Sequence, residues 1–412
     1  MKKSVLRGLA GVAVVGLAVA LAACSTPKPV ATGSELHIWT MFPVTPMADV
    51  SQVGAGVKAG AAAINAAGGL GKQHHKLVVK ECKTDFSPQS EIQCAQQASD
   101  DALSIAFVSP LQISGGDAVD KVLQDGELPV INSNPNTPEA LKSPVQFPIA
   151  QDVFNLSMCT VMGAKASGAK SVAYGIVTNP GTVASAERAV ALAGKNGVES
   201  LGVVEAPLST TDIAPFLQQA VDLKPELLVP SLSPMLMAGW LSGLPNSGFT
   251  GASCVTDELA PYQVLVGLGA AAKDIYMVGS YPEYTWDYPL LKQFNADAAA
   301  EAATGDKYAA TAPGNSPMSI LRGWLGTYVL QQAVANVEGD TLDRATLLAA
   351  LNKTTVTFGE GNPIVPIDFS KPNPDPEIAR LFNTSTILKV WNPDTKTIDQ
   401  TKVGPMDASQ LK

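Results

Sequence analysis

The sequence alternates short apolar segments with stretches of helical periodicity, and this alternation limits the possible folds more than any other feature. Val53, Val57, Ala61 and Ile64 recur at helical spacing, and Gly68-Gly69 should end this helix. We expect strands over residues 35–39, 76–80, 105–108 and 128–131, and helices over 88–102 and 116–124. Such an order builds a parallel sheet covered by helices on both faces.

The alternation starts again near residue 151, which predicts a second lobe. Its helices are expected over residues 151–167, 182–195, 213–223 and 234–241, and its strands over 171–177, 199–204, 226–229, 251–255 and 274–278. Three further helices, over 287–303, 318–337 and 342–352, have no strands between them. A hairpin over 386–391 and 397–401, with its turn at Asn392-Pro393-Asp394, follows them.

The sequence therefore predicts an α/β fold of two doubly wound parallel-sheet lobes. A length of 412 residues also exceeds what one hydrophobic core usually supports. We expect the three late helices to return to the first lobe and the hairpin to join the second. The first lobe would hold residues 35–149 and 283–356, and the second 150–282 and 357–412. Three crossings, near 147–152, 279–283 and 355–361, would form the hinge.

The first 23 residues have the features of a secretory signal peptide. Lys2, Lys3 and Arg7 precede an apolar run over 9–20 that is too short to span a bilayer comfortably. The run ends at Leu21-Ala22-Ala23-Cys24, which resembles a bacterial lipobox, so we expect lipidation of Cys24. Residues 24–34 are rich in Pro, Thr and small residues and predict a flexible tether. The protein is expected to be extracytoplasmic and attached to the membrane through this lipid alone.

The chain is acidic, with a formal net charge of −9. Removal of the signal segment takes away its three basic residues and leaves −12. This balance argues against binding to nucleic acid or to an anionic membrane through a basic surface.

Four cysteines remain besides Cys24, an even number that suggests disulfides outside the cytoplasm. Cys82 ends an expected strand and Cys94 lies in the next helix, which favours a local bridge. Spacing alone leaves open whether Cys159 and Cys254 pair.

Several motifs, taken in order, resemble one known family. The run from Gly56-Val57-Lys58-Ala59-Gly60 to Gly68-Gly69-Leu70-Gly71 resembles the first helix and glycine turn of type I periplasmic binding proteins, and more narrowly of the leucine/isoleucine/valine-binding family. The segment with Cys82 and Cys94 resembles a variant that carries a cystine there. The likeness continues at Ser109-Pro110-Leu111, Leu128-Pro129-Val130-Ile131 and Thr137-Pro138-Glu139. The resemblance implies two lobes that close on a small solute and deliver it to the permease and ATPase subunits of an ABC importer.

Ligands of open α/β sheets bind beyond the carboxyl ends of the strands. In the first lobe this places the loop over 109–116 at the cleft. Ser114 is expected to cap the next helix, and its hydroxyl and the free N–H groups of Gly115 and Gly116 offer a carboxylate site, where the family binds an α-carboxylate. A plain helix cap is the alternative. Asn134 and Asn136 fall where the family contacts the ligand head group, although Asn residues around a Pro also suit a simple turn.

In the second lobe, Asp257 follows a strand and matches the family's acid that pairs with a ligand ammonium. Glu258 is the neighbouring candidate, and an exposed loop acid is the alternative. Asp49, Pro180 and Ser233 stand where the family often has aromatic residues, so the cleft is expected to be more polar. Tyr284, with Tyr281 and Trp286, could replace those aromatics or pack within the hinge.

Signals for other functions fail. The glycine run over 54–60 has the wrong spacing for a dinucleotide site and fits close helix packing better. His74 and His75 are adjacent and would point to opposite faces of a strand, which argues against a metal site. The sequence has no Gly-x-Ser-x-Gly elbow. We therefore expect a binding protein with no cofactor and no catalysis. A membrane-tethered sensor of the same fold and an anchored hydrolase are the alternatives.

Overall fold

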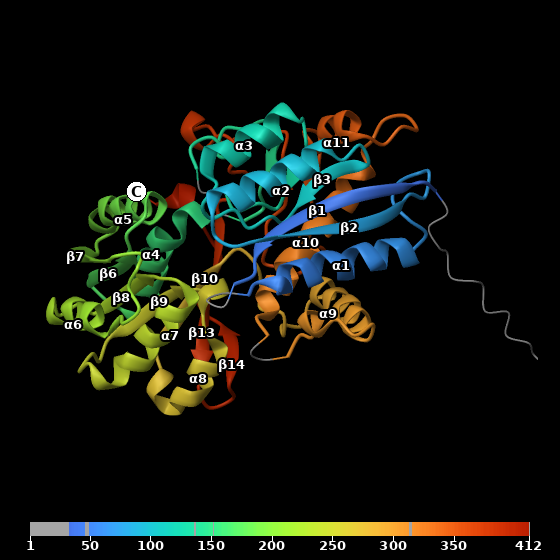
Figure 1. Ribbon diagram of the computed structural model, residues 1–412. Helices are drawn as coiled ribbons and strands as arrows, with labels where there is room; N and C mark the ends of the chain where they lie inside the picture. The colour runs from blue at the N-terminus through green and yellow to red at the C-terminus, as the bar shows by residue number, and fades with distance from the viewer. Residues whose placement is uncertain (1–32, 46–48, 136, 151, 313–314, 412) are drawn as a thin grey trace, which may run out of the picture.

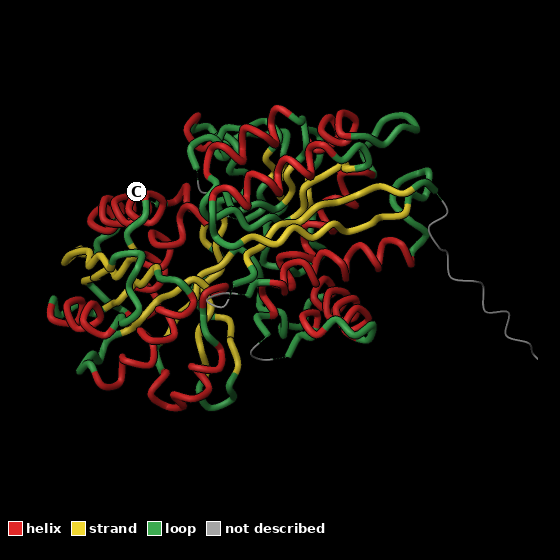
Figure 2. The backbone as a smooth tube through the Cα atoms, viewed as in Figure 1, coloured by secondary structure: helices red, strands yellow, loops and turns green. Residues whose placement is uncertain are grey.

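The computed structural model describes residues 33–45, 49–135, 137–150, 152–312 and 315–411. The signal segment, Cys24 and nearly all of the expected tether lie outside these residues. The described chain forms two lobes, each with a central sheet and helices on both faces (Figure 1). Figure 2 shows the strands of both sheets running toward the region where the lobes meet.

The first lobe is built on a five-stranded, wholly parallel sheet. Its order is β2-β1-β3-β4-β5. The strands are β1 (Glu35–Pro43), β2 (Lys76–Thr84), β3 (Ser104–Val108), β4 (Val130–Ile131) and β5 (Gln146–Phe147). The order reverses between β1 and β3, and ligands of doubly wound sheets bind at such a switch point.

Helices cover both faces of this sheet, and the three late helices return to it as predicted. One face carries α1 (Ser51–Ala66), α9 (Pro289–Ala302) and α10 (Pro317–Val334), and the other α2 (Pro88–Asp100) and α3 (Gly116–Asp125). The last helix of this lobe is α11 (Arg344–Leu351). The glycine run packs α1 closely on α10, as predicted, because a Cβ on Gly56 would lie 2.0 Å from the Ile320 carbonyl oxygen.

The second lobe repeats the strand order of the first. β7 (Glu199–Ala206), β6 (Ser171–Val177), β8 (Leu227–Ser231), β9 (Ala252–Thr256) and β10 (Ile275–Gly279) lie side by side in parallel. The predicted hairpin is present as β13 (Ser385–Asn392) and β14 (Thr397–Gln400), and β13 pairs antiparallel with β10. One face is covered by α4 (Asn155–Ser167) and α5 (Pro180–Lys195), the other by α6 (Ala214–Asp222), α7 (Pro234–Gly243) and α8 (Tyr262–Leu268).

The third crossing between the lobes lies later than predicted. After α11, the chain forms a small hairpin of β11 (Thr355–Val356) and β12 (Ile367–Asp368), and Phe358 and Phe369 are buried in the first lobe's core. The ring of Phe369 also packs edge-on against Phe147, with 5.3 Å between centroids. The expected crossing near 355–361 is therefore wrong, because burial of these aromatic rings keeps the segment on the first lobe. The chain passes to β13 near Asn383, whose Nδ2 donates to the Ile149 carbonyl at 2.8 Å.

Both possible cystines are formed. Cys82 and Cys94 are bonded with their Cα atoms 5.7 Å apart, which confirms the predicted local bridge. Cys159 on α4 and Cys254 on β9 are also bonded, with 95 residues of sequence between them. This second bridge joins a helix to the central sheet of the second lobe.

Candidate functional site

The loop that follows β3 holds an internal carboxylate at the position expected for a ligand. The side chain of Glu91 accepts hydrogen bonds from the N–H groups of Ile113, Ser114 and Gly115 at 2.6–3.2 Å. Glu91 is 0% exposed. The Gly115 amide, which was expected to bind a ligand carboxylate together with the Ser114 hydroxyl and the Gly116 amide, is thus already bonded within the protein. The Ser114 amide is bonded to Glu91 as well.

Ser114 does not cap the following helix. The N-cap residue of α3 is Gly115, and no side chain caps its first turn. The Ser114 side chain is exposed instead, so its hydroxyl remains accessible to solvent. The expectation that Ser114 caps α3 is wrong because the loop turns its amides inward, toward Glu91.

The structure describes only one of the two asparagines that were proposed to contact the ligand head group. Asn134 pairs with the main chain of Gln112, accepting from its N–H and donating to its carbonyl, each at 3.2 Å. This pairing fixes the loops after β3 and β4 to each other. Asn136 lies outside the described residues.

Two other residues at the strand ends were not among the predicted site residues. Ser109 follows β3 and Asn132 follows β4, and both have left-handed backbones, with φ of 49° and 56°. Both are buried, and their side chains donate to the Arg322 carbonyl at 3.1 Å and 2.8 Å. Non-glycine residues rarely hold this conformation unless surrounding contacts enforce it, and such positions concentrate at functional sites.

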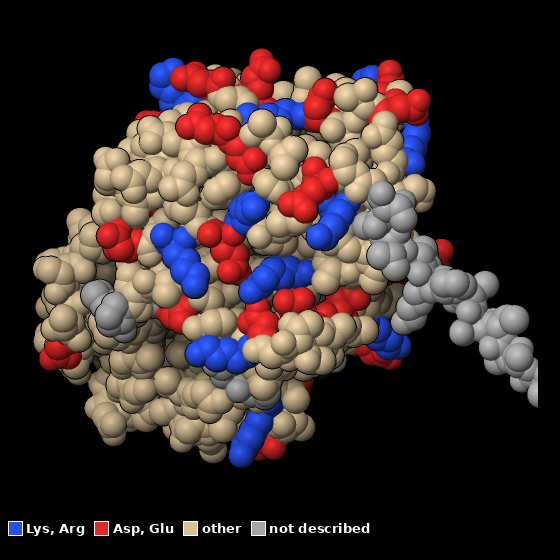
Figure 3. Space-filling view, turned by 45° about the vertical axis from the view of Figure 1, so that its right-hand side comes forward, with Lys and Arg blue, Asp and Glu red and all other residues tan. Residues whose placement is uncertain are grey.

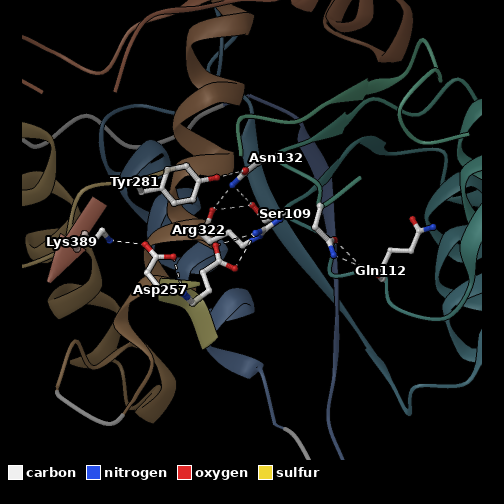
Figure 4. A network of polar contacts seen from close by, with 9 residues as sticks. Ser109, Gln112, Asn132, Asp257, Tyr281, Arg322 and Lys389 are labelled. Carbon is white, nitrogen blue, oxygen red and sulfur yellow. Dashed lines mark hydrogen bonds and ion pairs between the residues drawn. The ribbon is translucent and has the colours of Figure 1, made fainter. Parts of the chain in front are cut away.

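A tyrosine from the second crossing completes this group. The hydroxyl of Tyr281 donates to the Asn132 side-chain oxygen at 2.8 Å. Figure 4 shows Tyr281, Asn132 and Ser109 gathered around Arg322, with Asp257 and Lys389 close by. The ends of two first-lobe strands, helix α10 and the hinge therefore converge at one place.

An ion pair at the same place joins the two lobes. Arg322 on α10 of the first lobe donates through Nη1 to both oxygens of Glu258, at 3.1 Å and 3.2 Å. Glu258 follows β9 of the second lobe. The Arg322 side chain is 1% exposed and that of Glu258 is 24% exposed. The acid that contacts the other lobe is thus Glu258, which sequence reasoning named only as the neighbour of Asp257.

Asp257 has an internal cation as its partner. Its Oδ2 lies 2.6 Å from Nζ of Lys389 on β13, and Lys389 is 3.4 Å from Glu283 in the second crossing. All three side chains are buried. The expectation that Asp257 depends on a ligand ammonium for a partner is therefore wrong, because Lys389 supplies that charge.

Burial affects the charges of this buried triad of Asp257, Lys389 and Glu283. Desolvation raises the pKa of Glu283, and the nearby Asp257 carboxylate adds to that rise while Lys389 opposes it. Burial alone would lower the pKa of Lys389, but the charges of Asp257 and Glu283 outweigh it and raise that pKa. Lys389 thus stays protonated and joins β9, the second crossing and β13.

The remaining predicted site residues are dispersed. Asp49 accepts from the Ser51 main chain at 3.0 Å and from the Tyr308 hydroxyl at 2.7 Å. Ser233 is exposed at the N-cap of α7 and caps it with no side-chain hydrogen bond. Tyr284 is half-buried against the first lobe's core, and burial raises its pKa to about 12. None of their described contacts reaches Arg322 or Glu258.

Two residues of this network that were not predicted, Arg322 and Lys389, could have been found from the sequence. Arg322 is the only charged residue in the 18 residues of α10, and Lys389 is the only one in β13. A lone charge within an apolar element indicates a buried partner. Glu91 leaves no such trace, since it lies in an ordinary polar first turn.

A hollow of about 510 Å³ lies on the first lobe, away from this network. Its lining is mixed in charge and includes Lys58, Glu81 and Asp306, which are joined by ion pairs. In Figure 3, basic and acidic side chains are interspersed over the face shown. Among the described residues, no helix could span a membrane and no group of three or more His, Cys, Asp or Glu could hold a metal ion.

The described chain forms two sheet-and-helix lobes that are joined by three crossings, and a polar network lies where the strand ends meet. These features define a two-lobed binding protein. The family model of periplasmic binding proteins matches residues 45–377. The chain belongs to this family, whose members bind solutes outside the cytoplasm. A search of the curated proteins finds no match.

Solved structures share the fold at low sequence identity. An extracellular ligand-binding receptor from Verminephrobacter eiseniae has a TM-score of 0.72 and 20% identity, covering 88% of this chain and 99% of its own. A leucine-binding protein from Thermotoga maritima has a TM-score of 0.69 and 14% identity, covering 92% and 100%. A solute-binding protein of an R. palustris ABC transporter, in complex with 4-hydroxybenzoate, has a TM-score of 0.68 and 19% identity, covering 90% and 97%.

Proposed function

We propose that this protein is an extracytoplasmic solute-binding lipoprotein of an ABC importer. It captures a small amino-acid-like or other polar, amphipathic solute between its lobes and delivers it to permease and ATPase subunits. The observation that carries this proposal is the Arg322–Glu258 ion pair, which joins the lobes where the strands of both sheets end. A solute between the lobes would meet one charged donor and one charged acceptor there.

Lobe closure supplies the mechanism. A ligand that contacts both lobes stabilises the closed arrangement by its differential affinity for that state. Arg322 would contact it from the first lobe and Glu258 from the second. Ser114 and Ser233, whose hydroxyls are exposed at helix N-termini of the two lobes, are available to extend these contacts.

The solutes bound by structural relatives suggest where to begin. Leucine and 4-hydroxybenzoate, named for two of these relatives, both combine an apolar body with a polar group. The test is a thermal-shift panel of amino acids, amides, small acids and aromatic acids, followed by calorimetry. A bound solute should raise the melting temperature by mass action.

Variants connect any binding to the proposed site. Arg322→Met should abolish the thermal shift, whereas Lys142→Met, a change at an exposed lysine of the same lobe, should leave it unchanged. Circular dichroism would show that both variants fold. A panel without any binder, or chemical turnover of a solute by the purified protein, would contradict the proposal.

Membrane attachment through Cys24 is tested separately. The mature protein should carry a diacylglycerol on the Cys24 sulfur, visible by mass spectrometry of the N-terminal peptide. Cys24→Ser should release the protein from the membrane fraction. Retention of that variant in membranes would contradict lipid anchoring.

A further inference from the structure

The amides at the start of α3 form a complete site for one carboxylate. Gly115 N–H lies 2.6 Å from a Glu91 oxygen, and Ile113 and Ser114 N–H each lie 3.1–3.2 Å from both oxygens. Backbone N–H groups at a helix N-terminus attract anions. Here the attracted anion is a side chain of the protein itself, and it is completely buried.

The surrounding residues are arranged to keep Glu91 in this position. Ser87 caps α2, which places Glu91 in the first turn of that helix. A Cβ on Gly115 would lie 2.9 Å from the Glu91 carboxylate, so the absence of a side chain at Gly115 permits the contact. Gln112 anchors the loop from the other side, bonding to the Gly116 carbonyl at 2.8 Å.

A second carboxylate at this position would be unfavourable for two reasons. The three N–H groups already have an acceptor, so a ligand oxygen would have to displace Glu91. A carboxylate that approached without displacing it would be repelled by a like charge in a poorly solvated place.

We propose that Glu91 is a specificity-determining residue that closes this amide site to carboxylates. The solute is then recognised at the first lobe through an uncharged polar group, such as a carboxamide or hydroxyl. This inference rests on the proposed function in that the solute binds between the lobes.

The charges at the junction of the lobes agree with an uncharged solute. The ion pairs there join three carboxylates, on Asp257, Glu258 and Glu283, to two cations, on Arg322 and Lys389. A carboxylate ligand would add a further negative charge to this acidic excess. A carboxamide instead matches the Arg322–Glu258 pair, because its carbonyl can accept from the guanidinium and its NH₂ can donate to the carboxylate.

Formate, a small carboxylate, tests whether Glu91 closes the amide site, and this test requires no knowledge of the solute. Glu91→Ala removes the internal carboxylate and leaves the three amides without an acceptor. We expect formate to raise the melting temperature of Glu91→Ala relative to chloride at the same ionic strength, and to leave wild type and Glu139→Ala, a control at an exposed glutamate, unchanged. Stabilisation of wild type by formate, or of none of the three proteins, would overturn the proposal.

Paired solutes test the specificity in wild type, so the result does not depend on whether the variant folds. Calorimetry would compare leucine with leucinamide and 4-hydroxybenzoate with 4-hydroxybenzamide. We expect wild type to bind the amide of a pair more tightly by roughly tenfold or more, since the acid would meet a like charge at the amide site. Glu91→Ala should shift that preference toward the acid. Tighter binding of the acid by wild type would overturn the proposal.

The outcomes separate this inference from the proposed function. If formate stabilises only Glu91→Ala and no member of the wider solute panel binds, the closure of the amide site stands and solute binding fails. If a carboxylate solute binds wild type and Arg322→Met abolishes that binding, solute binding stands and the inference about Glu91 fails.

Discussion

Arg322 of the first lobe and Glu258 of the second are joined by an ion pair of 3.1 Å between Nη1 and Oε1. The main-chain carbonyl of Arg322 also accepts hydrogen bonds from the side chains of Ser109 and Asn132. The main chain of Arg322 is therefore fixed within the first lobe, and its guanidinium is directed at the second. This relationship connects the position of the lobes to the chemistry of the proposed site.

The first prediction concerns this ion pair. Glu258→Gln should destabilise the protein by about 1.5–3 kcal/mol, because the buried guanidinium loses its charged acceptor. In a protein that already carries Arg322→Met, Glu258→Gln should cost much less. Urea unfolding of wild type, the two single variants and the double variant would measure this coupling. Glu377→Gln, which breaks the exposed Lys142–Glu377 pair, is the control and should cost under ~1 kcal/mol. Additive effects of the two changes would contradict a direct interaction.

The second prediction concerns the lysine of the buried triad. Lys389→Met leaves two buried carboxylates without their cation and should lower the free energy of unfolding by about 3–5 kcal/mol. Adding Asp257→Asn and Glu283→Gln should recover part of this loss, because no uncompensated charge then remains. Urea unfolding checks both results, and a triple variant no more stable than Lys389→Met would contradict the explanation.

The third prediction is a pH dependence caused by Glu283. Its pKa in the folded protein is raised above the ordinary value of 4.5, chiefly by burial, so folding favours the protonated form. This contribution to stability is present below pH 4.5 and is lost as pH rises through the folded pKa. Glu283→Gln cannot ionise, so its stability relative to wild type should increase over this range. A difference in free energy of unfolding that stays constant with pH would refute the assignment.

The fourth prediction compares the two disulfides. Replacing Cys159 and Cys254 by Ala should cost about 4–5 kcal/mol, and replacing Cys82 and Cys94 about 3 kcal/mol, because the first bridge closes the longer loop. Urea unfolding would give the two values. Peptide mapping without reduction should find both linked peptides. Free thiols at Cys159 and Cys254, or a larger loss from the Cys82–Cys94 pair, would contradict the prediction.

The fifth prediction concerns the contact between α1 and α10. A Cβ at Gly56 would overlap the Ile320 carbonyl, so Gly56→Ala must push these helices apart and should cost about 1–3 kcal/mol. Gly194→Ala, in the exposed face of α5, is the control, because nothing lies within 4 Å of its Cβ position. That change should be neutral or stabilise by about 0.5–1 kcal/mol. Thermal unfolding would measure the melting temperature of each variant. Equal changes in the two variants would contradict close packing at Gly56.

Much of the fold could be predicted because its signals are local. Most strands and helices follow from apolar periodicity, and the hairpin of β13 and β14 follows from its Asn-Pro-Asp turn. The short strand β5, helix α8 and the hairpin of β11 and β12 were not predicted. The third crossing could not be placed in this way. Its position depends on whether Phe358 and Phe369 find partners on the first lobe, such as Phe147, which is distant in sequence.

The site could be predicted only in outline. Its location at strand ends follows from the topology of parallel sheets, and Asp257 and Glu258 were found because they follow β9. Their partners could not be assigned, because Lys389 is 132 residues from Asp257 and Arg322 is 64 residues from Glu258. The Glu91 contact was missed for the same reason.

The sequence by itself determined the two α/β units, the late helices, the terminal hairpin and the close packing at the glycine run, because periodicity and turn residues act over a few positions. Only the tertiary structure decided which charges neutralise one another and which amides remain for a ligand. Ion pairs and hydrogen bonds in a buried site depend on distances of a few ångströms between residues that are far apart along the chain, and folding alone sets those distances.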